Sequence, residues 1–177
     1  MEKLISNLLN FIDKYYHQRA INKVLIGLNL HRVIDIGAHK GEFINSIISL
    51  KKKVKIYSFE PQSKIFKELK NRFKRKKNIF VYNLAISNIN KNKKLNISIK
   101  TSTSTFSDYN ENSYWKKTKD FLLTGLNKSS IINSEIIQGV TLDKFCKNNN
   151  IKNIDLLKID TEGHEFEVLL GAKNLLK

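Results

Sequence analysis

The amino-acid sequence predicts a doubly wound α/β domain, with a mostly parallel sheet and helices on both faces. From residue 33 onward, short runs rich in β-branched residues alternate with stretches of helical periodicity. Such alternation is typical of parallel strands joined by helical crossovers. A chain of 177 residues is large enough for one domain with a substantial core. We therefore expect one α/β domain over residues 33–177, preceded by a helical segment over residues 1–32.

In the first half of the chain, each element is predicted from a local pattern. Apolar residues recur every three or four positions near the N-terminus, which favours a helix over residues 1–32. Three short apolar runs that end in Gly, Pro or Ser are predicted as strands, at residues 32–37, 54–61 and 79–87. The two amphipathic stretches between them are predicted as helices, at residues 42–52 and 64–77.

The second half of the chain is less regular. Polar and apolar residues alternate over residues 93–100, which indicates a strand at a sheet edge or in a hairpin. Residues 101–139 are rich in Ser, Thr and Asn with little periodicity, and a lid over a binding site and a polar surface loop fit them equally well. A short helical link over 140–150 leads to a buried strand over 154–160 and a final helix over 163–177. One side of that strand would lack a partner, so we expect a C-terminally incomplete domain.

The net charge of +16 invites comparison with nucleic-acid-binding proteins. The chain has 28 lysines and 4 arginines, whereas recognition of bases and phosphates favours the planar guanidinium of arginine. Lysine, asparagine and isoleucine have A/T-rich codons, so genome composition also accounts for the bias. These observations favour a solvated basic surface over a nucleic-acid partner.

The chain is expected to be cytoplasmic. Cys146 is the sole cysteine, so no internal disulfide can form and a reducing compartment is the natural setting. No apolar run approaches the roughly 18 residues of a membrane-spanning helix, and the N-terminus lacks the apolar stretch of a signal peptide. The apolar stripe of residues 1–32 could pack on the domain, lie on a membrane surface or form a homo-oligomer contact, and packing on the domain is the default.

The stretch VIDIGAHKGEF (33–43) carries the first chemical motif. A predicted strand reaches Asp35, turns through Gly37 and Gly41, and enters a helix. Glycines permit a tight turn and a close backbone approach, and the N–H groups at a helix start bind polar ligands. The G-x-x-x-G spacing differs from the dinucleotide and phosphate-loop signatures, so the motif alone also fits an ordinary turn.

The stretch YSFEP (57–61) carries the second motif. Glu60 ends the second predicted strand, 25 residues after Asp35. An acid at about this spacing accepts hydrogen bonds from both ribose hydroxyls of a nucleoside cofactor. A carboxylate here would also cap the following helix, and the two roles are compatible.

Five segments occur in order: DIGAHKG, FEP, LAIS, VTLDKFC and LLKIDTEGHEFEVLLGA. With them, residues 33–177 resemble the FkbM family of S-adenosylmethionine-dependent methyltransferases. The resemblance implies the class I methyltransferase fold, which is Rossmann-like. It also implies methyl donation from S-adenosylmethionine, usually to a hydroxyl of a sugar, polysaccharide or natural product.

The resemblance further implies a set of cofactor-binding residues. They are Asp35, Gly37, His39, Gly41, Glu60, Asn83 and Ala85. The first four would form the loop at the methionine end of the cofactor, Glu60 would hold the ribose, and the last two would lie near the adenine. His39 stands where the family usually has asparagine, which would alter a loop hydrogen bond without abolishing binding.

The stretch from Leu156 to Ala172 places four ionisable side chains within six residues: Asp160, Glu162, His164 and Glu165. In one interpretation the acids cap the following helix and favour its positive N-terminus. In a second, Asp160, Glu162 and His164 form a catalytic acid–base set at the end of the fourth strand. In a third, two of the carboxylates bind a divalent cation, but the spacing of a dedicated metal site is lacking, so no metal ligand is assigned. We expect capping and catalysis together.

The sequence therefore predicts an S-adenosylmethionine-dependent O-methyltransferase with a small-molecule or glycan acceptor. Two alternatives stay open. An RNA methyltransferase would explain the charge, although the N-P-P-Y-type motif of amino-group methylation is absent from the sequence. A non-catalytic fragment that binds a nucleoside or a partner protein would explain the missing C-terminal strands.

Overall fold

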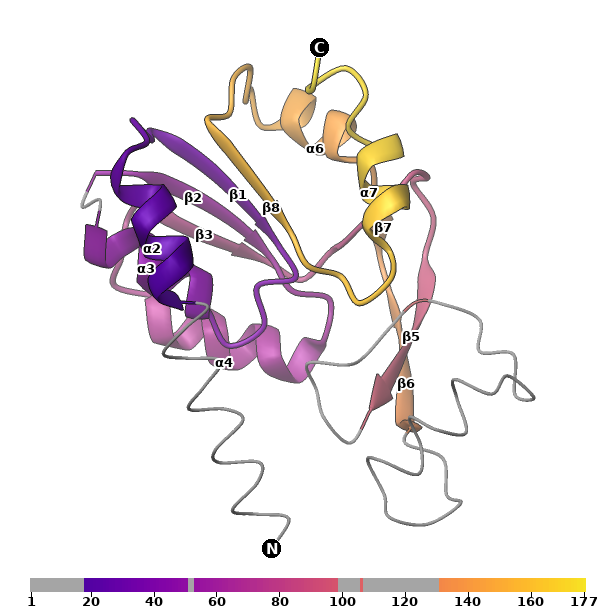
Figure 1. Ribbon diagram of the computed structural model, residues 1–177. Coiled ribbons are helices and arrows are strands. Elements are labelled where there is room, and N and C mark those ends of the chain that lie inside the picture. The colour runs from indigo at the N-terminus through magenta and orange to yellow at the C-terminus, as the bar shows by residue number, and fades with distance from the viewer. Residues whose placement is uncertain (1–17, 51–52, 99–105, 107–130) are drawn as a thin grey trace, which may run out of the picture.

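The computed structural model describes residues 18–50, 53–98, 106 and 131–177. In this part of the chain, four parallel strands form a central sheet in the order β3-β2-β1-β8 (Figure 1). The strands are β1 (Arg32–Ile36), β2 (Lys55–Phe59), β3 (Ile79–Tyr82) and β8 (Leu156–Ile159). This parallel order confirms the predicted α/β fold.

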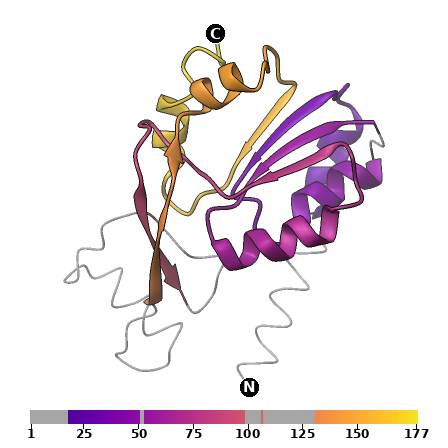
Figure 2. The ribbon, with the colours of Figure 1, turned by 180° about the vertical axis from the view of Figure 1, so that it is seen from behind.

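Helices cover both faces of the sheet (Figure 1, and from behind Figure 2). On one face lie α2 (Gln18–Ile26), α3 (Glu42–Leu50) and α4 (Ser63–Phe73), and on the other α6 (Leu142–Asn148) and α7 (Glu165–Leu170). Alternation along β1 explains the two cores, because successive side chains of a strand point to opposite faces. Val33 packs with the first group of helices, while Ile34 and Ile36 pack with the second. Among the described residues, no helix is long and apolar enough to cross a membrane.

Two small sheets extend beyond the central one. Strand β4 (Ala85–Ile86) pairs in parallel with β7 (Gly139–Val140), and β5 (Lys93–Ser98) pairs in antiparallel with β6 (Ile131–Ile137). The pair β5–β6 forms an arm that projects from the domain (Figure 1). The expectation of a hairpin or edge strand at residues 93–100 is confirmed for the described part.

Several predictions for single elements are wrong, among them the helix ends at residues 32 and 77, since α2 ends at Ile26 and α4 at Phe73. The strand predicted over 79–87 is divided, because the chain leaves the sheet after Tyr82 and β4 pairs elsewhere. The end of the supposedly unpatterned segment 101–139 forms β6 and β7. Apart from Phe106, residues 101–130 lie outside the described residues, as do residues 1–17. The strand predicted as buried, β8, is half-buried along its length, because β1 is its only sheet neighbour in the described part of the chain.

The final helix is also shorter than its pattern predicts, since α7 ends at Leu170. A Cβ at Gly171 would lie 2.0 Å from the carbonyl oxygen of Ser87. Backbone therefore meets backbone at this point, which only glycine permits. The approach joins the end of α7 to the chain that follows β4, so the second helical layer is anchored above the sheet.

A single side chain joins the starts of β1 and β8. One carboxylate oxygen of Asp155, Oδ2, accepts hydrogen bonds from the backbone N–H groups of His31 and Arg32, each at 2.7 Å. The N–H of Asp155 in turn donates to the carbonyl oxygen of Arg32 at 2.9 Å. These contacts bridge more than 120 residues of sequence, and so help to set the register of the two strands that flank the site.

Replacing Asp155 with alanine is expected to lower the free energy of unfolding by roughly 1 kcal/mol, because two backbone donors lose a charged acceptor that is partly screened by water. The hydrogen bonds from Arg32 and His31 hold the pKa of Asp155 below its usual range. The extra free energy of unfolding of the wild type over the variant is therefore fully present at neutral pH. It is lost as the pH falls through that lowered pKa. Denaturant unfolding at several pH values measures it, with Asp155→Asn as the matched control that keeps an acceptor oxygen. An advantage that persists unchanged at pH 2 would contradict the assignment.

Candidate functional site

A cavity of about 810 Å³ opens where β1, β2 and β8 end. From β1 the chain proceeds outward to β2 and β3 on one side, whereas β8 lies on the other side of β1. The space between β1 and β8 is thus the point where the strand order reverses, the usual place for a ligand in an open α/β sheet. Residues of both flanking loops line the cavity.

The glycine loop connects β1 to α3 and turns sharply. Gly37 has a φ of 77°, and a Cβ there would lie 1.8 Å from the carbonyl oxygen of Asp160. Only glycine allows the loops after β1 and β8 to approach so closely. Gly41 also has a positive φ, 82°, but a Cβ there would meet Leu69 and Phe73 of α4. Gly37 lines the cavity, while Gly41 serves the packing of the loop against α4.

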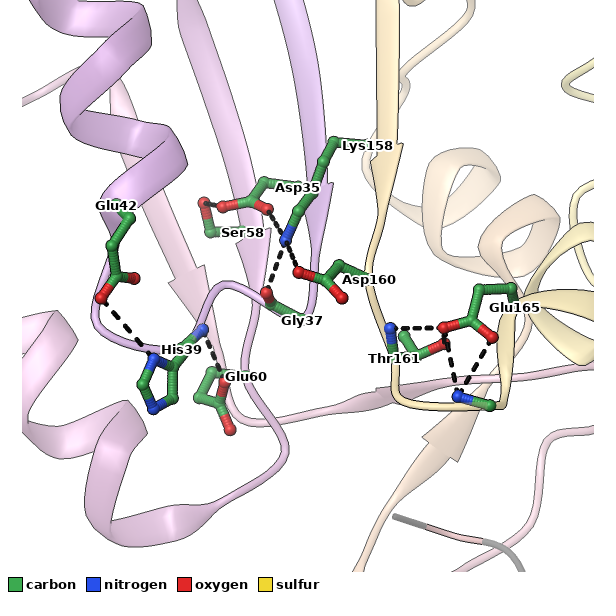
Figure 3. Close-up of polar contacts among 11 residues, drawn as sticks. Asp35, Gly37, His39, Glu42, Ser58, Glu60, Lys158, Asp160, Thr161 and Glu165 are labelled. Carbon is green, nitrogen blue, oxygen red and sulfur yellow. Dashed lines mark hydrogen bonds and ion pairs between the residues drawn. The ribbon is translucent and has the colours of Figure 1, made fainter. Parts of the chain in front are cut away.

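Glu60, directly after β2, forms a hydrogen bond with the backbone of the glycine loop. Its side chain is buried, with the residue 3% exposed, and it lines the cavity. Oε2 accepts the backbone N–H of His39 at 2.8 Å, and Oε1 accepts that of Gln62 at 2.9 Å (Figure 3 draws the contact with His39). Burial raises the pKa of Glu60 above its usual range, against the lowering effect of these two hydrogen bonds.

His39 itself adopts a φ of 45° and lines the cavity. Its Nδ1 lies 3.6 Å from Oε1 of Glu42, at the start of α3 (Figure 3). His39, the departure from the family pattern, therefore pairs through its side chain with the first residue of α3.

The two residues predicted near the adenine occupy different places. Asn83 donates its amide hydrogens to the carbonyl oxygens of Glu60 and Pro61, at 3.0 and 2.8 Å, and its Oδ1 accepts from Ser63 at 3.3 Å. It thereby shapes the turn that carries Glu60, and it is not among the cavity-lining residues. Ala85 is buried and does line the cavity.

Asp35, near the end of β1, is fully buried and forms an ion pair with a residue that sequence reasoning missed. Nζ of Lys158 lies 3.2 Å from its Oδ1, and the hydroxyl of Ser58 lies 3.5 Å from its Oδ2 (Figure 3). Burial raises the pKa of Asp35, and the neighbouring ammonium opposes the rise. The three residues lie side by side in the parallel register of β2, β1 and β8. The only sequence signal was a lysine inside the apolar run LLKID.

The carboxylates predicted to be catalytic lie in the loop after β8. Asp160 and Glu162 both line the cavity. The side chain of Asp160 is 67% exposed, with Oδ2 at 3.6 Å from Nζ of Lys158. Glu165 holds this loop, because its carboxylate accepts hydrogen bonds from the backbone N–H groups of Thr161 and Gly163 (Figure 3). Burial tends to raise the pKa of Glu165, but these hydrogen bonds outweigh it and the pKa is lowered. Glu165 thus organises the loop before the helix, whereas the predicted capping is wrong, because α7 begins after His164 without a side-chain hydrogen bond to its first N–H groups.

The structure does not bring His164 to the cavity. The residue is 5% exposed, and its Nε2 lies 3.0 Å from Oγ of Ser87 and 3.3 Å from Nζ of Lys93. Its Nδ1 lies 3.5 Å from Oε2 of Glu167. Burial, followed by the charge of Lys93, lowers the pKa of the imidazole. Within the described ranges, no group of three or more His, Cys, Asp or Glu side chains could hold a metal ion.

Comparisons with known proteins bear on this site. A family model for the methyltransferase FkbM domain matches residues 35–177. Among curated proteins, no sequence matches the chain. One similar solved structure is a proposed caffeoyl-CoA O-methyltransferase from Staphylococcus aureus, at 12% identity over 44% of this chain and 42% of that chain, with a TM-score of 0.36.

Two further solved structures are similar over part of their length. A fibrillarin/Nop5p complex matches at 24% identity over 35% of this chain and 32% of that chain, with a TM-score of 0.29. A SAM-dependent methyltransferase from Aquifex aeolicus matches at 17% identity over 45% and 47% of the two chains, with a TM-score of 0.34. The chain thus spans less than half the length of each structure.

The family model covers most of the chain, from the buried acid of β1 to the last residue. Its range includes the glycine loop, Glu60 and the loop after β8, which are the parts that meet at the cavity. The resemblance found from the sequence motifs is therefore confirmed, and the chain belongs to the FkbM methyltransferase family.

Proposed function

We propose that this chain is an S-adenosylmethionine-dependent methyltransferase that methylates a hydroxyl of a sugar or natural product. The observation that carries the proposal is Glu60, a buried carboxylate that lines the cavity. Each of its oxygens accepts one backbone N–H. A carboxylate offers about four acceptor positions, so two are left for the two hydroxyls of a ribose. Membership of the family supports the same cofactor.

Other lining residues fit the rest of such a cofactor. Leu84, Ala85 and Ile86 offer an apolar surface for the adenine. The glycine loop presents backbone rather than side chain at Gly37, as close approach to a ligand requires. The volume of about 810 Å³ lies in the range of roughly 300–1,000 Å³ that is usual for small-molecule sites.

The charge of the cavity favours an uncharged acceptor. Although the chain carries a net charge of +16, the described lining residues include four carboxylates and one ammonium group. The carboxylates are those of Glu42, Glu60, Asp160 and Glu162, and the ammonium is that of Lys158. An RNA phosphate would meet like charge here, whereas a positively charged sulfonium would be stabilised. We therefore favour a neutral hydroxyl over RNA as the acceptor.

In the proposed reaction the cofactor supplies a methyl group on a sulfonium centre, and the residues of this chain bind, align and accept a proton. Asp160 is the candidate general base for the acceptor hydroxyl, because it directly follows β8 and is exposed at the cavity. Glu162 lies in the same loop and is the second candidate. The hydrogen bonds from Thr161 and Gly163 to Glu165 restrain that loop, and a restrained loop favours alignment of the acceptor.

The cofactor assignment predicts measurable binding of S-adenosylhomocysteine and S-adenosylmethionine by calorimetry. Methyl transfer from radiolabelled S-adenosylmethionine is then expected to neutral oligosaccharides or glycosides in preference to RNA. Folded protein that binds neither nucleoside would contradict the proposal. Transfer to RNA that exceeds transfer to glycans would instead support the RNA alternative.

Replacing Glu60 with alanine is expected to weaken the binding of S-adenosylhomocysteine by about 10- to 100-fold, the value of hydrogen bonds to a charged group. The 2′,3′-dideoxy analogue separates this effect from damage to the glycine loop. If the carboxylate binds the ribose, the variant loses much less affinity for the analogue than for the natural ligand. Equal losses for both ligands would show that Glu60 acts only on the loop. The exposed Glu68→Ala on α4 is the matched control.

Replacing Asp160 with asparagine is expected to lower kcat by about 10²- to 10⁴-fold, because a positioned general base is lost. The dissociation constant of S-adenosylhomocysteine is expected to change little, since the side chain is largely exposed. Initial rates at saturating acceptor and calorimetry measure the two quantities. Unaltered kcat would leave Asp160 with only a role in the loop, and Glu68→Gln again serves as control.

A further inference from the structure

The ammonium group of Lys158 has three partners that come from three different parts of the site. Its Nζ lies 2.7 Å from the carbonyl oxygen of Gly37, 3.2 Å from Oδ1 of Asp35 and 3.6 Å from Oδ2 of Asp160 (Figure 3). A lysine ammonium has three N–H donors and no acceptor. One of them is donated to the carbonyl oxygen of Gly37, and the same charge forms ion pairs with the two carboxylates.

The shortest of these contacts is with backbone, not with the buried acid. The carbonyl of Gly37 belongs to the glycine loop, and Lys158 belongs to β8, 121 residues later. A lysine present only to neutralise Asp35 would not need this bond. The bond joins the loop after β1 to β8, the strand that Asp160 directly follows.

A second observation concerns the same junction. The backbone of Gly37 approaches Asp160 so closely that a Cβ would lie 1.8 Å from its carbonyl oxygen. The two loops thus approach each other through the same two residues that the ammonium group contacts. Any shift of one loop relative to the other would have to stretch the contacts of Lys158 with Gly37 or with Asp160.

We propose that Lys158 is a positioning residue that holds the glycine loop and Asp160 at a set separation across the β1–β8 junction. The inference deepens the proposed function, since the two loops it joins are those assigned to the cofactor and to the acceptor. Lys158 acts through its contacts with Gly37 and Asp160. Without the ammonium group, both loops stay folded, but the distance between them is no longer fixed.

The test uses four full-length proteins: wild type, Asp35→Asn, Lys158→Met, and the double variant. Lys158→Met alone leaves Asp35 buried without a cation. The stability of this variant therefore reports mainly the cost of an unpaired buried carboxylate. The double variant lacks both charges of the Asp35–Lys158 pair and is expected to fold, as circular dichroism and denaturant unfolding can verify. The decisive comparison is therefore the double variant against Asp35→Asn, where neutralisation is no longer needed.

In that comparison, the amide hydrogens of Gly37, Ala38, His39 and Gly41 are expected to exchange at least tenfold faster in the double variant. All four donate hydrogen bonds within the loop or to β2 and Glu60. The amides of α4 serve as an internal control and should not change. The dissociation constant of S-adenosylhomocysteine should rise at least tenfold, and kcat should fall further than KM rises. The exposed Lys152→Met is the matched control for loss of one positive charge.

Unchanged exchange of the loop amides overturns the inference, whether or not the protein binds the nucleoside. If the wild type binds the nucleoside, a double variant with the same affinity and kcat as Asp35→Asn also overturns the inference. Lys158 would then only neutralise Asp35. A wild type that binds no nucleoside contradicts the proposed function instead. Hydrogen exchange then decides by itself whether Lys158 holds the two loops together.

Discussion

The burial of a carboxylate at the end of β1 is the constraint on which this site depends. Asp35 is fully buried within the sheet, and a buried charge is tolerated only with a partner. The partner is Lys158, the residue beside it in the register of β8. The same ammonium group also contacts Gly37 and Asp160, so the residue that neutralises Asp35 also joins the two loops of the cavity. The geometry of the site at the strand ends thus depends on an ion pair within the sheet.

Around this pair, side chains act mainly on backbone. Glu60 accepts N–H groups of the glycine loop and of the chain before α4, while Glu165 accepts those of the loop after β8. The acids that follow β8 therefore have different roles, although they form one cluster in the sequence. Glu165 organises the loop, whereas Asp160 and Glu162 line the cavity. The cavity is locally acidic within a strongly basic chain, and this contrast is the electrostatic basis of the proposed cofactor and acceptor.

Much of the fold could be predicted from the sequence, because hydrophobic periodicity is local. The alternation that predicted strands and helices along the first half holds in β1, α3, β2 and α4. Prediction failed where pairing is remote. β4 and β6 find partners more than 30 residues away, and no local pattern encodes such a partner. For the site, Glu60 and Asp160 were visible as acids at strand ends, whereas Lys158 looked like part of an apolar run.

The sequence by itself determined the kinds of elements, the family and the candidate acids, since these depend on residue type and spacing along the chain. The tertiary structure alone decided which of those residues meet. Parallel register placed Lys158 against Asp35, while the turn after Glu162 directed His164 away from the cavity and against Ser87. The physical reason is that a shift of one residue in a strand reverses the face on which a side chain lies, and register is set by contacts between distant segments.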